Sequence, residues 1–219
     1  MNALTVDTSS KNNALRLDWC SHEAAKFAVM RWHYSKTMPA AMKRIGVWEG
    51  DRFVGAVLYG HGSGGSTDGR KYGFDRTGHI AELVRVALAP NRVHSTSKVV
   101  AISIKMISRS DRGLKMLISF ADFAGQEHIG TIYQASNWLY IGEYNSSGNC
   151  IINGEEVHPR TVGARYKSRS IEYLRKHVDP TAYYVKTIKH RYAYPLCKEA
   201  RKVLEGMAQP YPKKQAQVV

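Results

Sequence analysis

His33 and Tyr34 are adjacent in a polar segment that ends at Pro39. Imidazole and phenol groups exchange protons and imidazole also binds metals, so this pair could act as a proton shuttle, a metal ligand or a nucleobase contact. The structural alternative is a surface pair that ends the preceding helix.

Arg85 lies between two valines in a segment suited to burial. An arginine there needs an anion, either a bound phosphate or donor group or the carboxylate of a structural salt bridge.

Asp122 follows an apolar run over residues 116–121 that is typical of a strand buried on both faces. Sites of open α/β sheets lie beyond the carboxyl ends of strands. A desolvated carboxylate there could act as a general base, although Asp122 could instead cap the next helix. His33 and Asp122 together offer an imidazole and a carboxylate that could hold iron. Tyr133 lies in a predicted helix, where a tyrosine is most often part of the core.

The segments that carry these residues alternate between strands and helices. The apolar patterns predict strands over residues 15–19, 45–49, 52–59, 80–88, 116–121, 138–144 and 183–194. They predict helices over residues 22–32, 95–107, 125–137 and 161–177. Gly50-Asp51 and Asn153-Gly154 indicate tight hairpins, and the glycine-rich residues 60–78 indicate a mobile loop without a phosphate-binding Gly-Lys-Ser/Thr. Glu82 and Arg85 are expected on opposite faces of a regular strand.

This order of elements predicts a single-domain α/β (α+β) fold, with a mixed sheet flanked by helices and a basic C-terminal extension. We expect residues 1–158 to form the catalytic core and residues 159–219 to form an extension that completes the same domain. The order resembles the acetyltransferase-like GNAT fold. In that fold, a tyrosine in the helix that corresponds to Tyr133 often donates a proton to the leaving thiolate.

The GNAT resemblance also implies an anion site at the start of the helix over residues 95–107. The fold carries Arg/Gln-x-x-Gly-x-Gly/Ala there, and its backbone amides hold the pyrophosphate of acetyl-CoA. The sequence here reads Arg-Val-His-Ser-Thr-Ser over residues 92–97. The resemblance therefore implies cofactor contacts at Arg92, Ser95 and Ser97. Serines replace both glycines, which argues against ordinary CoA binding and leaves room for another anion.

Several segments together resemble the phage Mom family. They are HYSKTMP (33–39), ELVR (82–85), SFAD (119–122), IYQASNW (132–138) with Tyr140 and Gly142, and KHRYAYPL (189–196). The resemblance implies an enzyme that converts adenine in duplex DNA to a carbamoylmethyl (methylcarbamoyl) form on the exocyclic amine, which hides phage DNA from host restriction enzymes. It leaves acetyl-CoA or iron as candidate cofactors. The functional positions of the family match His33, Tyr34, Arg85, Ser97, Asp122 and Tyr133.

The basic charge is concentrated near the C-terminus. The chain has a formal charge of +14, and residues 159–219 hold 14 Lys or Arg against four Asp or Glu, with seven interleaved tyrosines. Cations neutralise phosphates and aromatic rings stack on bases, so the pattern predicts contact with double-stranded DNA. The alternative is a basic rim without a specific register. The predicted DNA-binding residues are Arg165, Lys167, Arg169, Arg175 and Lys176 on one helix, and Lys189 and Arg191 on the next strand.

The composition narrows the class of protein. No apolar run approaches the roughly 18 residues of a membrane span, and residues 1–11 lack the apolar segment of a secretory signal. Three distant cysteines argue against a disulfide framework or structural zinc and fit a reducing cytoplasm, that of the host if a phage encodes the chain. The sequence leaves open whether the chain forms a homodimer. The alternative functions are a GNAT-type acyltransferase acting on a protein or small amine, and a DNA-binding module with an inactive site.

Overall fold

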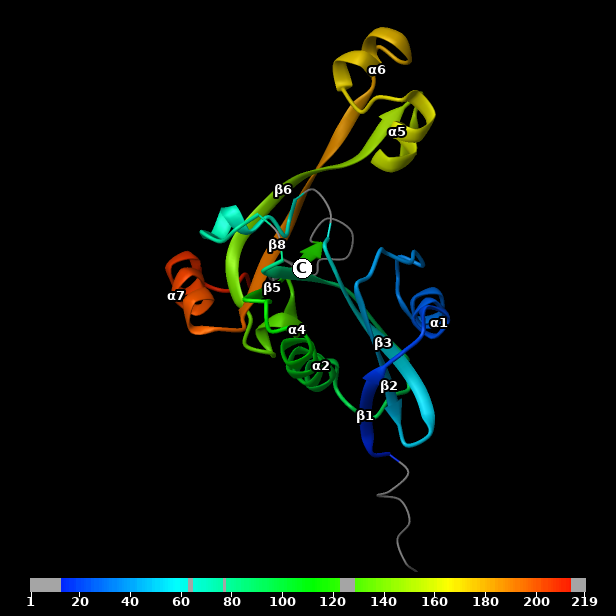
Figure 1. Cartoon of the computed structure of the whole chain (residues 1–219). Coiled ribbons are helices and arrows are strands. Elements are labelled where there is room, and N and C mark those ends of the chain that lie inside the picture. Colours follow the sequence, from blue (N-terminus) through cyan, green and yellow to red (C-terminus); the bar gives the residue numbers. More distant parts are fainter. Residues whose placement is uncertain (1–12, 63–64, 77, 123–128, 214–219) are drawn as a thin grey trace, which may run out of the picture. The chain divides into compact units, whose positions relative to one another are not determined.

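The computed structural model describes residues 13–62, 65–76, 78–122 and 129–213 (Figure 1). The elements follow in the order β1 (Leu15–Trp19), α1 (His22–Trp32), β2 (Lys43–Glu49), β3 (Arg52–Gly60), the 3-10 helix η1 (Gly69–Tyr72), β4 (Ile80–Leu88), α2 (Thr96–Ser110), β5 (Met116–Asp122), α4 (Thr131–Gln134), β6 (Leu139–Ile152), β7 (Glu155–Val157), α5 (Pro159–Tyr166), α6 (Ile171–His177), β8 (Tyr183–Pro195) and α7 (Lys198–Met207). The strands form a sheet of order β1-β2-β3-β4-β5-β8-β6-β7. Strands β1 to β4 are antiparallel neighbours, whereas β4 and β5 are parallel. The predicted mixed α/β class is confirmed.

The described residues separate into two compact units. Unit 1 contains the residues up to Ser119 together with Gly130–Ile141 and Tyr192–Tyr211, and unit 2 contains Phe120–Ile129, Gly142–Arg191 and the residues from Pro212 onward. The boundary expected at residue 158 falls inside unit 2. None of the described helices is long and apolar enough to cross a membrane.

Cap and turn residues produce the N-terminal elements where the sequence predicts them. Helix α1 begins after Ser21, whose side chain accepts a hydrogen bond from the Ala24 N–H at 3.1 Å. Gly50 has φ +60° and Asp51 keeps an ordinary φ, which is the pattern of a type II′ turn between β2 and β3. These local signals fix the first third of the fold.

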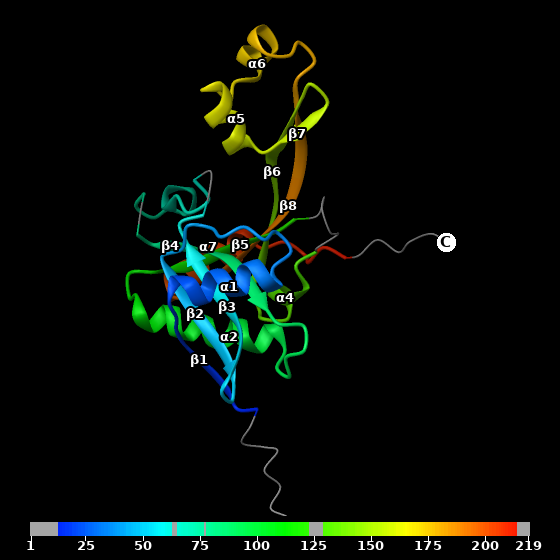
Figure 2. The same ribbon diagram turned by 90° about the vertical axis from the view of Figure 1, so that its right-hand side faces the viewer.

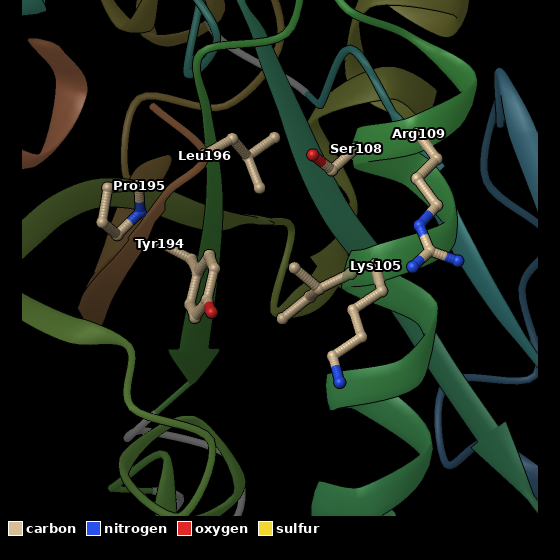
Figure 3. A pocket seen from close by; sticks show the side chains of 7 residues that line it. Lys105, Ser108, Arg109, Tyr194, Pro195 and Leu196 are labelled. Carbon is tan, nitrogen blue, oxygen red and sulfur yellow. The ribbon is translucent and has the colours of Figure 1, made fainter. Parts of the chain in front are cut away.

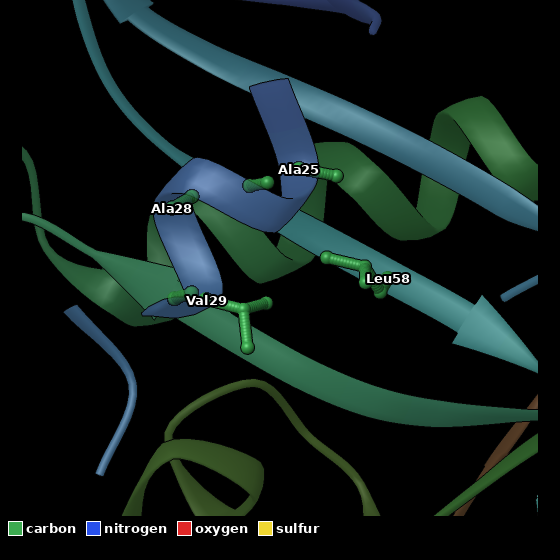
Figure 4. Close-up of a cluster of buried hydrophobic side chains, with 6 residues drawn as sticks. Ala25, Ala28, Val29 and Leu58 are labelled. Carbon is green, nitrogen blue, oxygen red and sulfur yellow. The ribbon is translucent and has the colours of Figure 1, made fainter. Parts of the chain in front are cut away.

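Helices α1 and α2 cover opposite faces of the sheet in unit 1 (Figure 1, Figure 2). On one face, Ala25, Ala28 and Val29 of α1 pack over Leu58 of β3 (Figure 4). On the other, the hydroxyl of Tyr59 lies 2.8 Å from the Ser103 hydroxyl of α2. Small residues on α1 let the helix lie close to the sheet.

A β-bulge interrupts β4. Leu58 of β3 is opposite Arg85, but the next residue, Tyr59, is opposite Leu83. Val84 is therefore an extra residue that has no partner in the register. A bulge bends its strand and changes the face to which the following side chains point.

The bulge places Glu82 and Arg85 on the same face of the sheet. Glu82 is opposite Gly60, and Arg85 is opposite Leu58. Leu58 and Gly60 are two residues apart on β3, so they and their partners share one face, the face that α1 covers. The expectation of opposite faces is wrong because it assumed a regular strand.

The predicted length of the helix over residues 125–137 is wrong, because its described part is shorter than expected. Helix α4 spans only Thr131–Gln134, and Gly130 before it has φ +76°, which a continuing helix does not allow. Residues 123–128 lie outside the described residues.

The glycine-rich segment, residues 60–78, contains the ordered helix η1, in which Tyr72 is buried.

The basic helix expected over residues 161–177 is two helices. Helix α5 ends at Tyr166, Lys167 has a left-handed φ of +57°, and Ser170 caps α6 by accepting from the Tyr173 N–H. Unit 2 has its own apolar core, formed by Cys150, Ile152, Val157, Val162, Leu174 and Ala182. Helix α7, which buries Ala200 and Leu204, was not predicted from the sequence.

Candidate active site

His33 lies at the end of α1, where its N–H donates to the carbonyl of Val29 at 3.1 Å. Its side chain is buried, with 8% of the residue exposed. The backbone N–H of Ser35 donates to His33 Nδ1 at 3.1 Å, and the Ser35 hydroxyl lies 2.9 Å from the same nitrogen. The tight turn after α1 thus holds the ring in one orientation.

These contacts decide which nitrogen of His33 carries the proton. A backbone N–H can only donate, so Nδ1 is the acceptor and the neutral ring is protonated on Nε2. Burial, together with the positive charges of Arg85 and Lys36, lowers the pKa of His33 to about 4. At neutral pH, His33 is therefore an uncharged hydrogen-bond donor through Nε2.

The same arrangement does not suit iron at this residue. A histidine that binds metal through Nε2 donates from Nδ1 to a neighbour, which is the reverse of what His33 does here. In the part of the chain that the structure describes, no group of three or more His, Cys, Asp or Glu side chains could hold a metal. The side chain of Asp122, the other predicted ligand, lies outside the described residues, so iron at His33 and Asp122 stays a prediction and carries no reaction step below.

Tyr34 and Arg85 lie next to His33. The rings of Tyr34 and His33 stack with centroids 4.3 Å apart, and Tyr34 is 59% exposed. One guanidinium nitrogen of Arg85 donates to the Val84 carbonyl at 2.7 Å, while its buried Nε has no hydrogen-bond partner among the described residues. The salt bridge that could have explained Arg85 structurally is not found in the described chain. Its charge is available to a ligand.

The hydroxyl of Tyr133 lies at the end of the paired part of β4 and β5. The pairing of these strands runs as far as Glu82 with Ile118. At the next position, the Ser119 hydroxyl lies 2.8 Å from the Leu83 carbonyl and 2.7 Å from the Tyr133 hydroxyl. Ser119 is the donor in both contacts, and the Leu83 carbonyl and the Tyr133 oxygen are the acceptors. The oxygen of Tyr133 keeps a second lone pair that can accept a hydrogen bond from a substrate.

Burial sets the electrostatics of Tyr133. Desolvation raises the pKa of its phenol to about 12, and the neighbouring Tyr34, Glu82 and Tyr192 also raise it. Tyr133 therefore stays protonated at neutral pH. Its ring packs against Tyr192, with centroids 5.1 Å apart, which fixes its position.

Glu82 is a site residue that the sequence analysis missed. Its carboxylate accepts a hydrogen bond from the Ser66 hydroxyl at 2.6 Å, and its charge acts on Tyr133. The signal was its position three residues before Arg85, but only the bulge shows that both side chains share a face. We call His33, Tyr34, Glu82, Arg85, Ser119 and Tyr133 the His33 cluster; all six belong to unit 1.

The predicted cofactor residues form a separate group at the start of α2. The guanidinium of Arg92 donates to the Ala89 carbonyl and to the Thr96 hydroxyl. Ser95 caps α2 by accepting from the Lys98 N–H. Ser97 is expected to act with His33, but among the described residues no hydrogen bond or ion pair joins Ser97 to the His33 cluster; its hydroxyl lies 3.2 Å from that of Ser95.

Asp122 is the last residue of β5 and belongs to unit 2. Its side chain lies outside the described residues, so its role as general base stays a prediction.

The seven predicted DNA-binding residues also lie in unit 2, on α5, on α6, between these two helices and on β8: Arg165, Lys167, Arg169, Arg175, Lys176, Lys189 and Arg191. The expectation that five of them share one helix is wrong, because α5 ends before Lys167.

A hollow of about 260 Å³ lies elsewhere in unit 1 (Figure 3). It is lined by Ile104, Lys105, Ser108, Arg109, Tyr194, Pro195 and Leu196. None of these residues belongs to the His33 cluster, and none was predicted as a site residue.

The sequence matches the Mom protein family over residues 14–213. The chain belongs to the Mom protein family. A relative, "Methylcarbamoylase mom" of Escherichia phage Mu, is 30% identical over 208 residues, which cover 91% of this chain and 84% of the relative. The predicted resemblance is confirmed, and the range matched to the Mom family includes the whole His33 cluster.

Solved acetyltransferases are similar to this Mom-family chain at lower identity. A Bacillus subtilis acetyltransferase in complex with CoA is 10% identical, with a TM-score of 0.45 over 84% of this chain and 99% of the other. The ribosomal-protein-S5-alanine acetyltransferase of Vibrio fischeri is 9% identical, with a TM-score of 0.47 over 84% and 94%.

Proposed function

We propose that this protein transfers a carbamoylmethyl (methylcarbamoyl) group to the exocyclic amine of adenine in DNA, in the cytoplasm of a phage-infected host, and so shields phage DNA from restriction. Membership of the Mom family and a relative named methylcarbamoylase support the reaction class. The observation that carries the proposal is the convergence of His33, Arg85 and Tyr133 at the bulge of β4.

The exocyclic amine of adenine is a poor nucleophile, so the enzyme must orient it and remove its proton as the new N–C bond forms. The Tyr133 oxygen accepts one hydrogen bond from Ser119 and has a second lone pair that can accept one from the amine. The Nε2–H of His33 can donate to a carbonyl of the transferred group or to a ring nitrogen of the base. Both contacts position neutral groups before reaction.

Charge on the donor or its leaving group would be met by Arg85, whose guanidinium forms no salt bridge among the described residues. The amine proton needs a carboxylate acceptor. Asp122 is the base predicted from sequence, and Glu82 is a second carboxylate, whose charge acts on Tyr133. We assign the proton to one of these two groups, and substitution of each distinguishes them.

Adenine in a duplex must leave the base stack to be modified. Residues 159–191 of unit 2 hold nine Lys or Arg and two Asp or Glu. The side chains of Arg165, Lys167 and Lys176 are exposed, as contacts to a phosphate backbone require. This part of unit 2 supports a role in holding DNA.

The test is nucleoside mass spectrometry of DNA from bacteria that express the chain. We expect a deoxyadenosine heavier by one carbamoylmethyl unit and resistance of the DNA to adenine-sensitive restriction enzymes. Unmodified nucleosides in cells with abundant folded protein would contradict the proposal. Acetyl transfer to a protein or amine without DNA would favour the acyltransferase alternative.

A further inference from the structure

A buried carboxylate lies against the loop that precedes α2. Glu49 is the last residue of β2 and is 2% exposed. Its Oε1 accepts hydrogen bonds from the backbone N–H groups of Val93 at 2.7 Å and His94 at 2.8 Å. Its Oε2 accepts from the guanidinium of Arg52 at 2.7 Å. Three donor groups from two distant segments therefore meet at one anion that belongs to the protein.

Glu49 remains charged in this environment. Burial alone would raise the pKa of its carboxyl, but the hydrogen bonds from His94, Val93 and Arg52 outweigh burial and leave the pKa below its usual value. Each oxygen has a donor, which is what makes a buried carboxylate tolerable. The anion is a permanent part of the loop at neutral pH.

This loop is the place where the GNAT resemblance implies a pyrophosphate. The amides of Val93 and His94 belong to the stretch that would hold it, and both are bonded to Glu49. Two guanidinium nitrogens of Arg92 donate to the Ala89 carbonyl and the Thr96 hydroxyl, while its buried Nε has no hydrogen-bond partner among the described residues. The loop already holds its anion, and a pyrophosphate placed beside Glu49 would meet a like charge in a partly desolvated setting.

We propose that Glu49 is a built-in anion that fills this loop and makes the protein select against donors with a CoA-type pyrophosphate. The link to catalysis rests on the proposed function, since it concerns the donor of that reaction. The residues of this loop do not fit CoA, and the transferred group therefore arrives on a carrier that this loop does not hold. Glu49 is a specificity-determining residue in this account.

The test measures binding of coenzyme A and of inorganic pyrophosphate to the full chain by isothermal titration calorimetry. We expect no saturable binding by the wild-type chain at millimolar ligand. In Glu49→Gln the side chain keeps its shape and loses its charge, so we expect affinity for both ligands to rise by about tenfold or more. Asp51→Asn is the matched control, because it removes one exposed negative charge from the same hairpin and should leave binding unchanged.

Arg52→Gln is a second control, because it removes a partner of Glu49 but keeps the carboxylate, and it should still exclude CoA. If Glu49→Gln does not fold, the amide protons of Val93 and His94 in the wild-type chain give the answer by NMR. We expect coenzyme A to leave their chemical shifts unchanged.

Two results would overturn the inference: submillimolar CoA binding by the wild-type chain that shifts these amides, or a folded Glu49→Gln variant that binds no better. Neither readout requires DNA modification, so this inference and the proposed function can fail independently.

Discussion

The His33 cluster and the loop over residues 92–97 are two polar regions of the same unit, and they use their polar groups differently. In the His33 cluster, the Nε2–H of His33 and the guanidinium of Arg85 retain donors that the described chain does not use. In the loop, the amides of Val93 and His94 and the guanidinium of Arg92 are bonded to protein acceptors. A site needs donors left over for its ligand, and the His33 cluster has them at His33 and Arg85. In the loop, Glu49 occupies the amides of Val93 and His94, and the buried Nε of Arg92 has no hydrogen-bond partner among the described residues.

The two regions also differ in charge. Arg85 brings a cation to the His33 cluster without a salt-bridge partner among the described residues, whereas Glu49 supplies the loop with an anion. A negative group of the donor could therefore pair with Arg85 in the first region, whereas in the second the Val93 and His94 amides and Arg52 already bind the Glu49 carboxylate. The following predictions test this difference.

Replacement of Tyr133 should have the largest effect. Tyr133→Phe removes the hydroxyl that would accept from the adenine amine, and we expect modified deoxyadenosine to fall by about a hundredfold or more. Tyr59→Phe is the matched control, because Tyr59 is also a buried tyrosine whose hydroxyl is bonded to a serine, Ser103 of α2, and it does not belong to the His33 cluster. Both changes should cost similar stability, measured by urea unfolding, and equal losses of modification would contradict the distinction.

His33 should rank second. His33→Phe removes the Nε2–H donor and should lower the modification rate by about tenfold to a hundredfold, whereas His33→Gln can still donate and should retain part of the rate. Rates would be measured with purified protein once the donor is supplied, or as modified fraction in cells. A Phe variant as active as the Gln variant would remove the donor role.

His33 should also make stability depend on pH. Its pKa is about 4 in the folded protein and near the ordinary value of 6.5 when unfolded, so the unfolded chain binds the proton first as the pH falls. We expect the free energy of unfolding to decrease between about pH 6.5 and pH 4, and to decrease less in His33→Gln. Urea unfolding at several pH values measures this, and identical slopes would rule out a buried neutral His33.

The exposed cations of unit 2 should show a smaller, additive effect. Arg165→Ala combined with Lys176→Ala should weaken DNA binding by about tenfold at low salt and reduce the salt dependence by about one phosphate contact per residue. Fluorescence anisotropy with a short duplex measures both. An unchanged salt slope would show that these residues form a basic rim away from DNA.

The smallest effect on modification is expected at the loop. Thr96→Val removes the acceptor of Arg92 and should lower the free energy of unfolding by about 1 kcal/mol. Modification per folded molecule should stay at the wild-type level. A large loss of modification at unchanged stability would show that the loop takes part in the reaction.

Much of the secondary structure could be predicted because its signals are local. Ser21, Gly50-Asp51 and Asn153-Gly154 act within a few residues, and the elements beside them form where expected. The interrupted basic helix was missed because Lys167 adopts a left-handed conformation that its residue type does not announce. The helix that contains α4 was predicted too long, because the apolar periodicity before Gly130 is ambiguous.

The sequence by itself determined the family, the mixed α/β class and most residue types of the His33 cluster, because caps, turns and ordered motifs are properties of short segments. Only the tertiary structure decided which polar groups remain available. The bulge of β4 turned Glu82 toward the face of Arg85, and the distant Glu49 occupied the amides before α2. Both results depend on pairing between segments far apart in the chain, and no local pattern encodes that pairing.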